Sequence, residues 1–543
     1  MKRIKGNTLC NLIGIICLTL GAGVLFRTAA LFASNDIWFD ELFTVEFTIR
    51  PISQMLPLAM KDVHPPFYYI YTRLIYVLLQ GIGITDNAVK AVKIASIIPY
   101  LGILVYLVTF FRKRFGLLSA GLAFVFILTM PQLPAYISEA RMYSLAMFLI
   151  CAMFIHAMEM TDCEGRIRGY IHLAATSIYG IAAMYTHYYA FIAAGSIWAC
   201  VYILFLIKVL RKDINEVKKH RFTKGIHPDI SIITACVAVS LIAYVPWMSA
   251  VLSQVGAVSQ NYWIQPVTLR TLAGCVKFIF KPEFESGLFN ILAAVVLFAL
   301  YVVMIVRFLY NSFGNKKTFE LRFVFFALTV FVLLILAGFV ASVIIRPVFV
   351  YRYMLPVMGL FWMCFAISLG NFVGAALEKK DIPQLICVIL TTVLLFAVCL
   401  RDYHMFIWEE EKKCVGMLAC NIAFGEIADN YDEAVLVCNF NQVQDILWFY
   451  LENDSVLWGE TNETLIGDIC GRAPIRMTTD ISELKTMTEA SKVGGETGFL
   501  FVGSGNARDE IIDIWEADGM KVEQIADSCL VERYYFNIYK VVW

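Results

Sequence analysis

The chain has 543 residues, of which 59% are hydrophobic and 16% are charged. Soluble domains carry about 25% charged residues, so this composition excludes an ordinary soluble protein and indicates one that crosses a membrane repeatedly. Lysine plus arginine and aspartate plus glutamate both number 44, and this neutral balance gives no indication of a nucleic-acid partner. The sequence has neither a P-loop nor the Cys and His spacing of a zinc site.

Eleven apolar stretches are candidates for membrane spans, since a spanning helix takes about 20 predominantly apolar residues. They lie at 9–33, 88–111, 117–133, 142–160, 170–187, 189–210, 229–249, 288–310, 323–345, 353–375 and 382–400. A further stretch, 66–84, is apolar but short, and Arg73 interrupts it.

The positions of lysine and arginine decide whether 66–84 crosses the membrane, because cytoplasmic loops are enriched in these residues. If 66–84 lies along the surface, the basic segments at 112–114 and 208–224 fall on the cytoplasmic side. If it spans, both segments fall on the outer side, against the rule. The sequence therefore predicts about eleven spans, a cytoplasmic N-terminus and a surface helix over 66–84.

The tail of the chain differs from the rest, because apolar residues become sparser and acidic residues outnumber basic ones. The pattern predicts strands at 434–438, 498–502 and 535–542, and helices at 441–451 and 507–518. The sequence thus predicts a membrane domain over 1–400. It predicts a small α/β domain outside the membrane over 401–543.

Short polar segments lie at the ends of the apolar stretches, and the predicted topology puts them on the outer side of the membrane. They contain Asp40 and Glu41, Asp62 and His64, Arg141 and Tyr143, His187, and Arg352. Charged groups at a membrane surface are costly unless they are solvated or used in function. Their common side indicates a single site.

The carboxylates of this set have two interpretations. Asp40 or Glu41 could accept a proton from a hydroxyl, as a general base does, or the pair could cap the start of a helix. Asp62 and His64 precede Pro65-Pro66, which favours the start of a helix. They could shape the site, or form a plain polar turn.

The cations of the set also have two interpretations. Arginine pairs bidentately with phosphate oxygens, so Arg141 and Arg352 together with His187 could hold a phosphate. Each arginine alone could instead extend to the interface, and Tyr143 could belong to the aromatic belt of a membrane protein. Taken as a set, these residues favour an anion site.

The order of these motifs resembles a known group of enzymes. An Asp40-Glu41 pair in the first outer loop, then His64 before two prolines, then Arg141 and Tyr143 in S-x-x-R-x-Y, resembles the polyprenyl-phosphate-sugar-dependent glycosyltransferases of the GT-C fold. Among them, the chain is most similar to the family of protein O-mannosyltransferases and of the lipid A aminoarabinose transferase. The resemblance implies juxtamembrane helices in the first external loop.

The resemblance, which covers roughly residues 1–375, also implies roles for the site residues. Asp40 would be the catalytic carboxylate, with Glu41 as its neighbour. The residues near the donor phosphate would be Arg141, Tyr143 and Arg352, and we expect His187 to assist them. Asp62 and His64 would bind the acceptor or shape the site; Val63 stands where aminoarabinose transferases carry Glu.

The sequence therefore predicts an inverting glycosyltransferase of the plasma membrane. It would move a hexose or related sugar from a polyprenyl-phosphate carrier to a hydroxyl of a glycan, lipid or protein of the cell envelope, on the outer face. We expect no cofactor, and a divalent metal is not implied. The alternatives are a lipid flippase or transporter, and a non-catalytic envelope assembly protein. The sequence does not decide the sugar or the acceptor.

Overall fold

The computed structural model describes most of the chain, and the described residues form two compact units. The described ranges are 8–32, 37–163, 165–216, 230–257, 264–314, 318–379, 382–431, 434–438, 457–458, 481–487, 489, 491–503, 505–531 and 534–543. The first unit comprises Met1–Ala30, Ala59–Tyr71 and Lys93–Phe406. The second comprises Leu31–Leu58, Thr72–Val92 and Ile407–Trp543.

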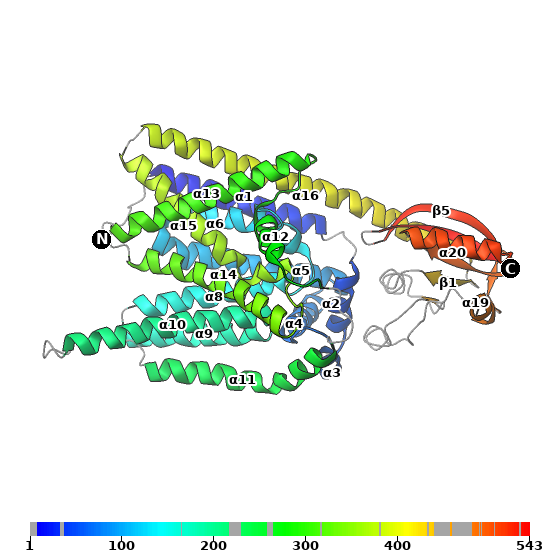
Figure 1. Cartoon of the computed structure of the whole chain (residues 1–543), viewed down its shortest axis with the longest axis horizontal. Helices are drawn as coiled ribbons and strands as arrows, with labels where there is room; N and C mark the ends of the chain where they lie inside the picture. Colours follow the sequence, from blue (N-terminus) through cyan, green and yellow to red (C-terminus); the bar gives the residue numbers. More distant parts are fainter. Residues whose placement is uncertain are drawn as a thin grey trace. The chain divides into compact units, whose positions relative to one another are not determined.

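Long helices dominate the chain (Figure 1). They are α1 (Thr8–Phe32), α5 (Ala88–Tyr106), α6 (Arg112–Thr129), α8 (Tyr143–Asp162), α9 (Arg166–Met184), α10 (Tyr188–Glu216), α11 (Ile230–Ala257), α13 (Gly287–Gly314), α14 (Thr318–Ile344), α15 (Leu355–Lys379) and α16 (Ile382–Asn430). A π-helical turn, η1 (Leu107–Phe111), joins α5 to α6. Shorter helices are α7 (Ala135–Ser138) and α12 (Leu269–Phe280).

Within the described residues, nine helices are long and apolar enough to cross a membrane. One of them, Ala88–Thr129, covers the expected span at 88–111 and most of the expected span at 117–133. Gly116 interrupts it with a φ of 88°, a value that favours glycine. The expected span at 170–187 corresponds to α9, which is not among the nine. The chain is a polytopic α-helical membrane protein, as the sequence predicts.

Close packing holds the helices of the first unit together. Nearly every side chain of α8 is buried, and the α13 residue Tyr301 stacks on Phe361 of α15 with ring centroids 4.1 Å apart. At the crossing of α1 and α6, a Cβ on Gly121 would clash with the carbonyl oxygen of Gly14. Small residues at such crossings let two membrane helices approach closely.

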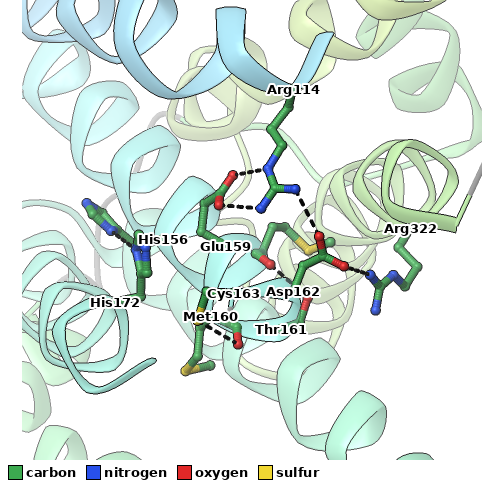
Figure 2. Close-up of polar contacts among 10 residues, drawn as sticks. Arg114, His156, Glu159, Met160, Thr161, Asp162, Cys163, His172 and Arg322 are labelled. Atoms are coloured by element: carbon green, nitrogen blue, oxygen red, sulfur yellow. Dashed lines mark hydrogen bonds and ion pairs between the residues drawn. The ribbon is translucent and has the colours of Figure 1, made fainter. Parts of the chain in front are cut away.

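Four arginine and carboxylate side chains tie α6, α8 and α14 together (Figure 2). The Arg114 guanidinium donates to both carboxylate oxygens of Glu159 at 2.6 Å, and to Asp162 at 2.9 Å. Arg322 donates to the other oxygen of Asp162 at 3.0 Å. This arrangement uses these charges in ion pairs between helices, so we assign the cluster a structural role.

A chain of hydrogen bonds lies beside these ion pairs and joins α5, α8 and α9. Tyr106 donates to the hydroxyl of Tyr179 at 2.8 Å, and its oxygen lies 2.9 Å from Nε2 of His156. The Nδ1 atoms of His156 and His172 lie 2.8 Å apart (Figure 2). Each of these polar groups within apolar helices therefore has a partner, as buried polar groups require.

Three short helices follow α1: α2 (Phe39–Ile49), α3 (Ile52–Lys61) and α4 (Phe67–Gly81). The stretch expected to lie along the surface is α4, whose 15 residues extend about 22 Å at 1.5 Å per residue. That is less than the roughly 30 Å hydrocarbon core of a bilayer, and α4 is not among the nine apolar helices. Arg73 of α4 donates to the carbonyls of Thr48 and Ile49 at the end of α2.

The tail of the second unit contains a mixed sheet with strand order β2-β1-β4-β6-β5, and β3 pairs with β4. The strands are β1 (Val435–Cys438), β2 (Leu457–Trp458), β3 (Lys492–Val493), β4 (Glu496–Gly503), β5 (Lys521–Val531) and β6 (Tyr534–Val542). Two helices accompany them, α19 (Ile481–Met487) and α20 (Gly505–Ala517). Strand β1 is parallel to β2 and β4, whereas β4, β6 and β5 are antiparallel. Trp515 of α20 is buried against Phe499 and Phe501.

The predicted α/β composition of the tail is confirmed. Strands β1, β4 and β6 and helix α20 occupy the predicted positions. The helix expected at 441–451 lies outside the described residues. Strand β5 was not predicted, and α16 continues as one helix to Asn430, beyond the expected boundary at 400.

Candidate active site

The candidate site of the first unit is built from connections between helices. Four of them contribute: the turn 62–66 between α3 and α4, the turn 139–142 before α8, the turn 185–187 between α9 and α10, and the 3-10 helix η2 (Tyr351–Met354) before α15. Residues that are far apart in sequence therefore meet at one end of several long helices.

Asp62 and His64 form a buried hydrogen-bonded group in the first of these connections. Nδ1 of His64 lies 3.3 Å from Oδ2 of Asp62, and Tyr69 of α4 donates to the same oxygen at 2.8 Å. The two prolines end α3 and start α4, as Pro at the beginning of a helix favours. The backbone N–H of Phe67 then donates to the carbonyl of Tyr185 at 2.9 Å. The turn is thus fixed against the connection that carries His187.

His187 lies at the centre of a group of rings. Its ring centroid is 6.0 Å from that of His64, 5.7 Å from Tyr143 and 5.1 Å from Tyr353. Its Nδ1 accepts a hydrogen bond from the backbone N–H of Tyr189 at 3.1 Å. These contacts bring the turn 62–66, the start of α8 and η2 together around His187.

Arg141 and Arg352 act electrostatically on the same group. The Arg141 side chain is buried, and its backbone N–H donates to the carbonyl of Glu139 at 2.7 Å. Burial lowers the pKa of His64, Asp62 opposes this effect, and Arg141 and Arg352 lower the pKa further. In the connection between α9 and α10, burial lowers the pKa of His187 well below its usual range, and His64 and both arginines add to the effect. Both histidines are therefore neutral near pH 7.

The environment of Asp62 favours its ionised form. Burial alone would raise the pKa of this carboxyl, but the interaction with His64, the charge of Arg141 and the hydrogen bond from Tyr69 lower it. The site thus combines two guanidinium groups and neutral imidazoles with the buried Asp62 carboxylate and with Glu139, whose charge acts on Tyr143. The two guanidinium groups suit an anion with phosphate chemistry.

Neither a protein-family model nor a curated protein sequence matches this chain. Solved structures are similar to it. ArnT from Cupriavidus metallidurans in the apo state aligns with a TM-score of 0.54 at 12% identity, over 97% of each chain. The same protein bound to undecaprenyl phosphate aligns with a TM-score of 0.52 at 13% identity, again over 97% of each chain. The chain has the GT-C fold.

The fold expected from the motif order is thereby confirmed, and the likeness extends further than the motifs do. The sequence resemblance covers roughly residues 1–375, whereas the structural alignment covers nearly the whole chain. The alignment with ArnT therefore extends into the α/β tail.

Asp40 and Glu41 belong to the second unit and lie in the first turn of α2. Glu41 is buried, and its carboxylate accepts a hydrogen bond from the backbone N–H of Trp38 at 3.1 Å. Glu41 therefore caps the start of α2, which is the helix-capping alternative that its position in the sequence allows. Asp40 is half-buried in the same turn.

Several aromatic side chains of the site were not singled out as site residues. Tyr69 holds the Asp62 carboxylate, and the tilted rings of Tyr189 and Tyr353 pack against each other with centroids 4.8 Å apart. A signal for Tyr69 exists, because the two prolines before α4 place it in the first turn of that helix. No signal in the sequence links Tyr189 to Tyr353. Over the described part of the chain, no three His, Cys, Asp or Glu side chains gather to hold a metal ion.

The neutral histidines predict a pH-dependent stability. A histidine with a lowered folded-state pKa takes up its proton more readily when unfolded, so stability is highest above the ordinary pKa and falls as the pH drops. We expect the apparent unfolding temperature in detergent to fall from about pH 7.5 to about pH 5, and to fall less in His64→Gln. The control His404→Gln alters an exposed residue of α16 and should follow the wild type. Identical pH curves for His64→Gln and the wild type would contradict the prediction.

Proposed function

We propose that this GT-C protein transfers a sugar from a polyprenyl-phosphate carrier to a hydroxyl acceptor. The observation that carries the proposal is the convergence of His64, Tyr143 and Tyr353 on the buried His187, in a site whose connections also carry Arg141 and Arg352. A guanidinium pair at a site of this kind suits the phosphate of a lipid carrier. Support also comes from ArnT, which has the same fold and is described in complex with undecaprenyl phosphate.

The proposed reaction is a single displacement. Asp40 takes the proton of the acceptor hydroxyl, and the oxygen attacks the anomeric carbon from the face opposite the phosphate. The new carbon–oxygen bond forms as the bond to the phosphate oxygen breaks, so the anomeric configuration inverts. Arg141 and Arg352 stabilise the charge that develops on the departing phosphate. Tyr143 and His187 line this position, and Asp62 with His64 shapes the acceptor side.

We further propose where the reaction takes place. The distribution of Lys and Arg favours a cytoplasmic N-terminus, and it favours placing the site and the α/β tail on the outer face of the cell membrane. The acceptor would then be a glycan, lipid or protein of the cell envelope, and the sugar a hexose or a related sugar. The proposal requires no cofactor.

A flippase or transporter is the rival function, and a non-catalytic assembly protein is a second rival. A transporter site is expected near the middle of the bilayer, between broken helices. The charged residues of the candidate site instead lie in connections at the ends of helices, at 62–66, 139–142 and 351–354. This position favours chemistry at a membrane surface.

Reconstituted liposomes test the proposal. The purified protein is given a panel of radiolabelled polyprenyl-phosphate sugars with crude envelope acceptors, and release of free polyprenyl phosphate is measured. We expect one donor to be consumed and the labelled sugar to appear on an acceptor. The anomeric configuration of the transferred sugar should be inverted relative to the donor. Movement of labelled lipid between leaflets without donor consumption would support the flippase instead. Neither donor consumption nor lipid movement would favour the assembly protein.

A further inference from the structure

A buried amide in an otherwise apolar helix reaches the backbone next to the candidate site. Gln254 lies near the end of α11 and is buried. Its Nε2 donates to the carbonyl of Ala59 at 3.3 Å and to that of Met60 at 3.2 Å. These carbonyls belong to the last turn of α3, where a helix offers no partners of its own. Gln254 therefore caps the helix that leads into the turn carrying Asp62.

The other end of the same amide is held by Tyr188. The Tyr188 hydroxyl donates to Oε1 of Gln254, and Trp247 of α11 donates to the Tyr188 oxygen at 3.3 Å. Tyr188 directly follows His187 in the sequence, at the start of α10. The hydrogen bonds thus run from α11 to the start of α10, and from α11 to the end of α3.

These contacts fix the turn 62–66, called the site turn below, from both of its ends. Gln254 holds the two carbonyls just before the turn, and Tyr185 accepts the hydrogen bond of Phe67 just after it. Between these points lie Asp62 and His64. A shift of the carbonyls at Ala59 and Met60 would therefore move Asp62 relative to the rest of the site.

We propose that Gln254, held by Tyr188, is a positioning residue that fixes Asp62 and His64 for the transfer reaction. The inference rests on the proposed function. The alternative is that Gln254 only satisfies its own polar atoms in an apolar surrounding, as buried amides generally must. The two readings differ in what happens to the site turn when the amide is removed.

Positioning predicts a specific kinetic effect. Displacing a reacting group by about 1 Å can lower a rate by about 100-fold, and we expect a loss of about 10-fold in kcat for Gln254→Leu because Tyr69 still holds Asp62. The donor KM should change less than about 2-fold, since Arg141 and Arg352 lie on other connections. Tyr188→Phe should give a smaller loss of kcat. The double variant should be no worse than Gln254→Leu, because both side chains act through the same contact.

Hydrogen exchange of the full-length protein in detergent gives a readout that does not depend on activity. In Gln254→Leu, amide exchange over 59–67 should accelerate, whereas exchange in the core of α8 should stay as in the wild type. The matched control is Ser240→Ala, which removes a buried hydroxyl of α11 that bonds to the carbonyl of Cys236 in its own helix. It should leave both regions unchanged.

Each outcome decides the inference. Faster exchange confined to 59–67 together with a lower kcat supports positioning. Unchanged exchange there, or faster exchange throughout the protein, overturns it. If Gln254→Leu does not fold, Tyr188→Phe provides the same comparison. If the wild type consumes no polyprenyl-phosphate sugar, the proposed function fails, and with it the part of the inference that concerns catalysis. Exchange then decides by itself whether Gln254 fixes the turn.

Discussion

Asp40→Asn should lower kcat/KM for sugar transfer by about 10³-fold, because the amide cannot accept the proton of the acceptor hydroxyl and general-base catalysis contributes roughly 10² to 10⁴. Asparagine has nearly the same shape as aspartate, so donor binding should persist. The measurement is the initial rate of polyprenyl phosphate release in liposomes, over a range of donor and acceptor concentrations. The donor KM should change little while kcat falls.

Glu41→Gln is the matched control for this prediction. Glu41 is buried and accepts the backbone N–H of Trp38. Glutamine keeps that acceptor oxygen and loses only the charge near the N-terminus of α2, so the start of the helix should weaken by about 0.5 kcal/mol. We expect the apparent unfolding temperature to fall, with a loss of transfer of less than about 10-fold. A larger loss of kcat in Glu41→Gln than in Asp40→Asn would show that Glu41, and not Asp40, is the base. Near-normal transfer by Asp40→Asn would exclude Asp40 as the base.

The arrangement of the site could be anticipated because its residues lie at the ends of apolar helices. Hydrophobic length locates each helix, and the placement of basic residues assigns each end to one side of the membrane. That reasoning groups His64, Arg141, His187 and Arg352 before any contact is known. The structure brings His64 and His187 within 6.0 Å, and both arginines act on them. The reasoning from the sequence could not predict which of these side chains contact one another.

Gln254 could not be predicted from the sequence as a residue of the site, because it lies near the end of a membrane helix. The apolar stretch in the sequence stops at 249, so residue 254 falls into a predicted loop. A glutamine is ordinary in a loop and therefore gives no signal there. The structure continues α11 to Ala257 and buries the side chain. A polar residue within a membrane helix is expected to have a role. Its partners, the carbonyls of Ala59 and Met60, are almost 200 positions away, and no local pattern encodes them.

Strand β5 was missed for a different physical reason. Its pairing with β6 shifts register between Gln524 and Ala526, and again between Ala526 and Cys529. An extra residue at each shift breaks the alternation of inward and outward side chains, which is the signal that predicts a strand. The apolar stretch locates only the part of α16 that is long and apolar enough to span a membrane, whereas the helix itself continues to Asn430, since charged residues are compatible with a helix that leaves the membrane.

Arg141→Gln should lower kcat/KM by about 10²-fold, since removing one donor that stabilises developing charge typically costs 10² to 10³ in rate. Both the donor KM and kcat should suffer, because a guanidinium that binds the phosphate acts on the bound donor and on the departing phosphate. Arg141→Lys should recover part of the loss, as it restores the charge without the bidentate geometry. Donor titrations in liposomes measure both parameters.

Arg322→Gln is the control for the loss of one arginine. Arg322 pairs with Asp162 in the structural cluster between α8 and α14 (Figure 2). The substitution Arg322→Gln should therefore leave the donor KM unchanged. The pH profile adds a second signature, because Arg141 lowers the pKa of His64. Removing the Arg141 charge raises the pKa of His64, so His64 becomes protonated at a higher pH. As the pH is lowered, the activity of Arg141→Gln should therefore begin to fall at a higher pH than that of the wild type. If Arg141→Gln lowers kcat/KM no more than Arg322→Gln and leaves the pH profile in place, Arg141 does not act on the donor phosphate. The phosphate would then have to be held elsewhere than between Arg141 and Arg352.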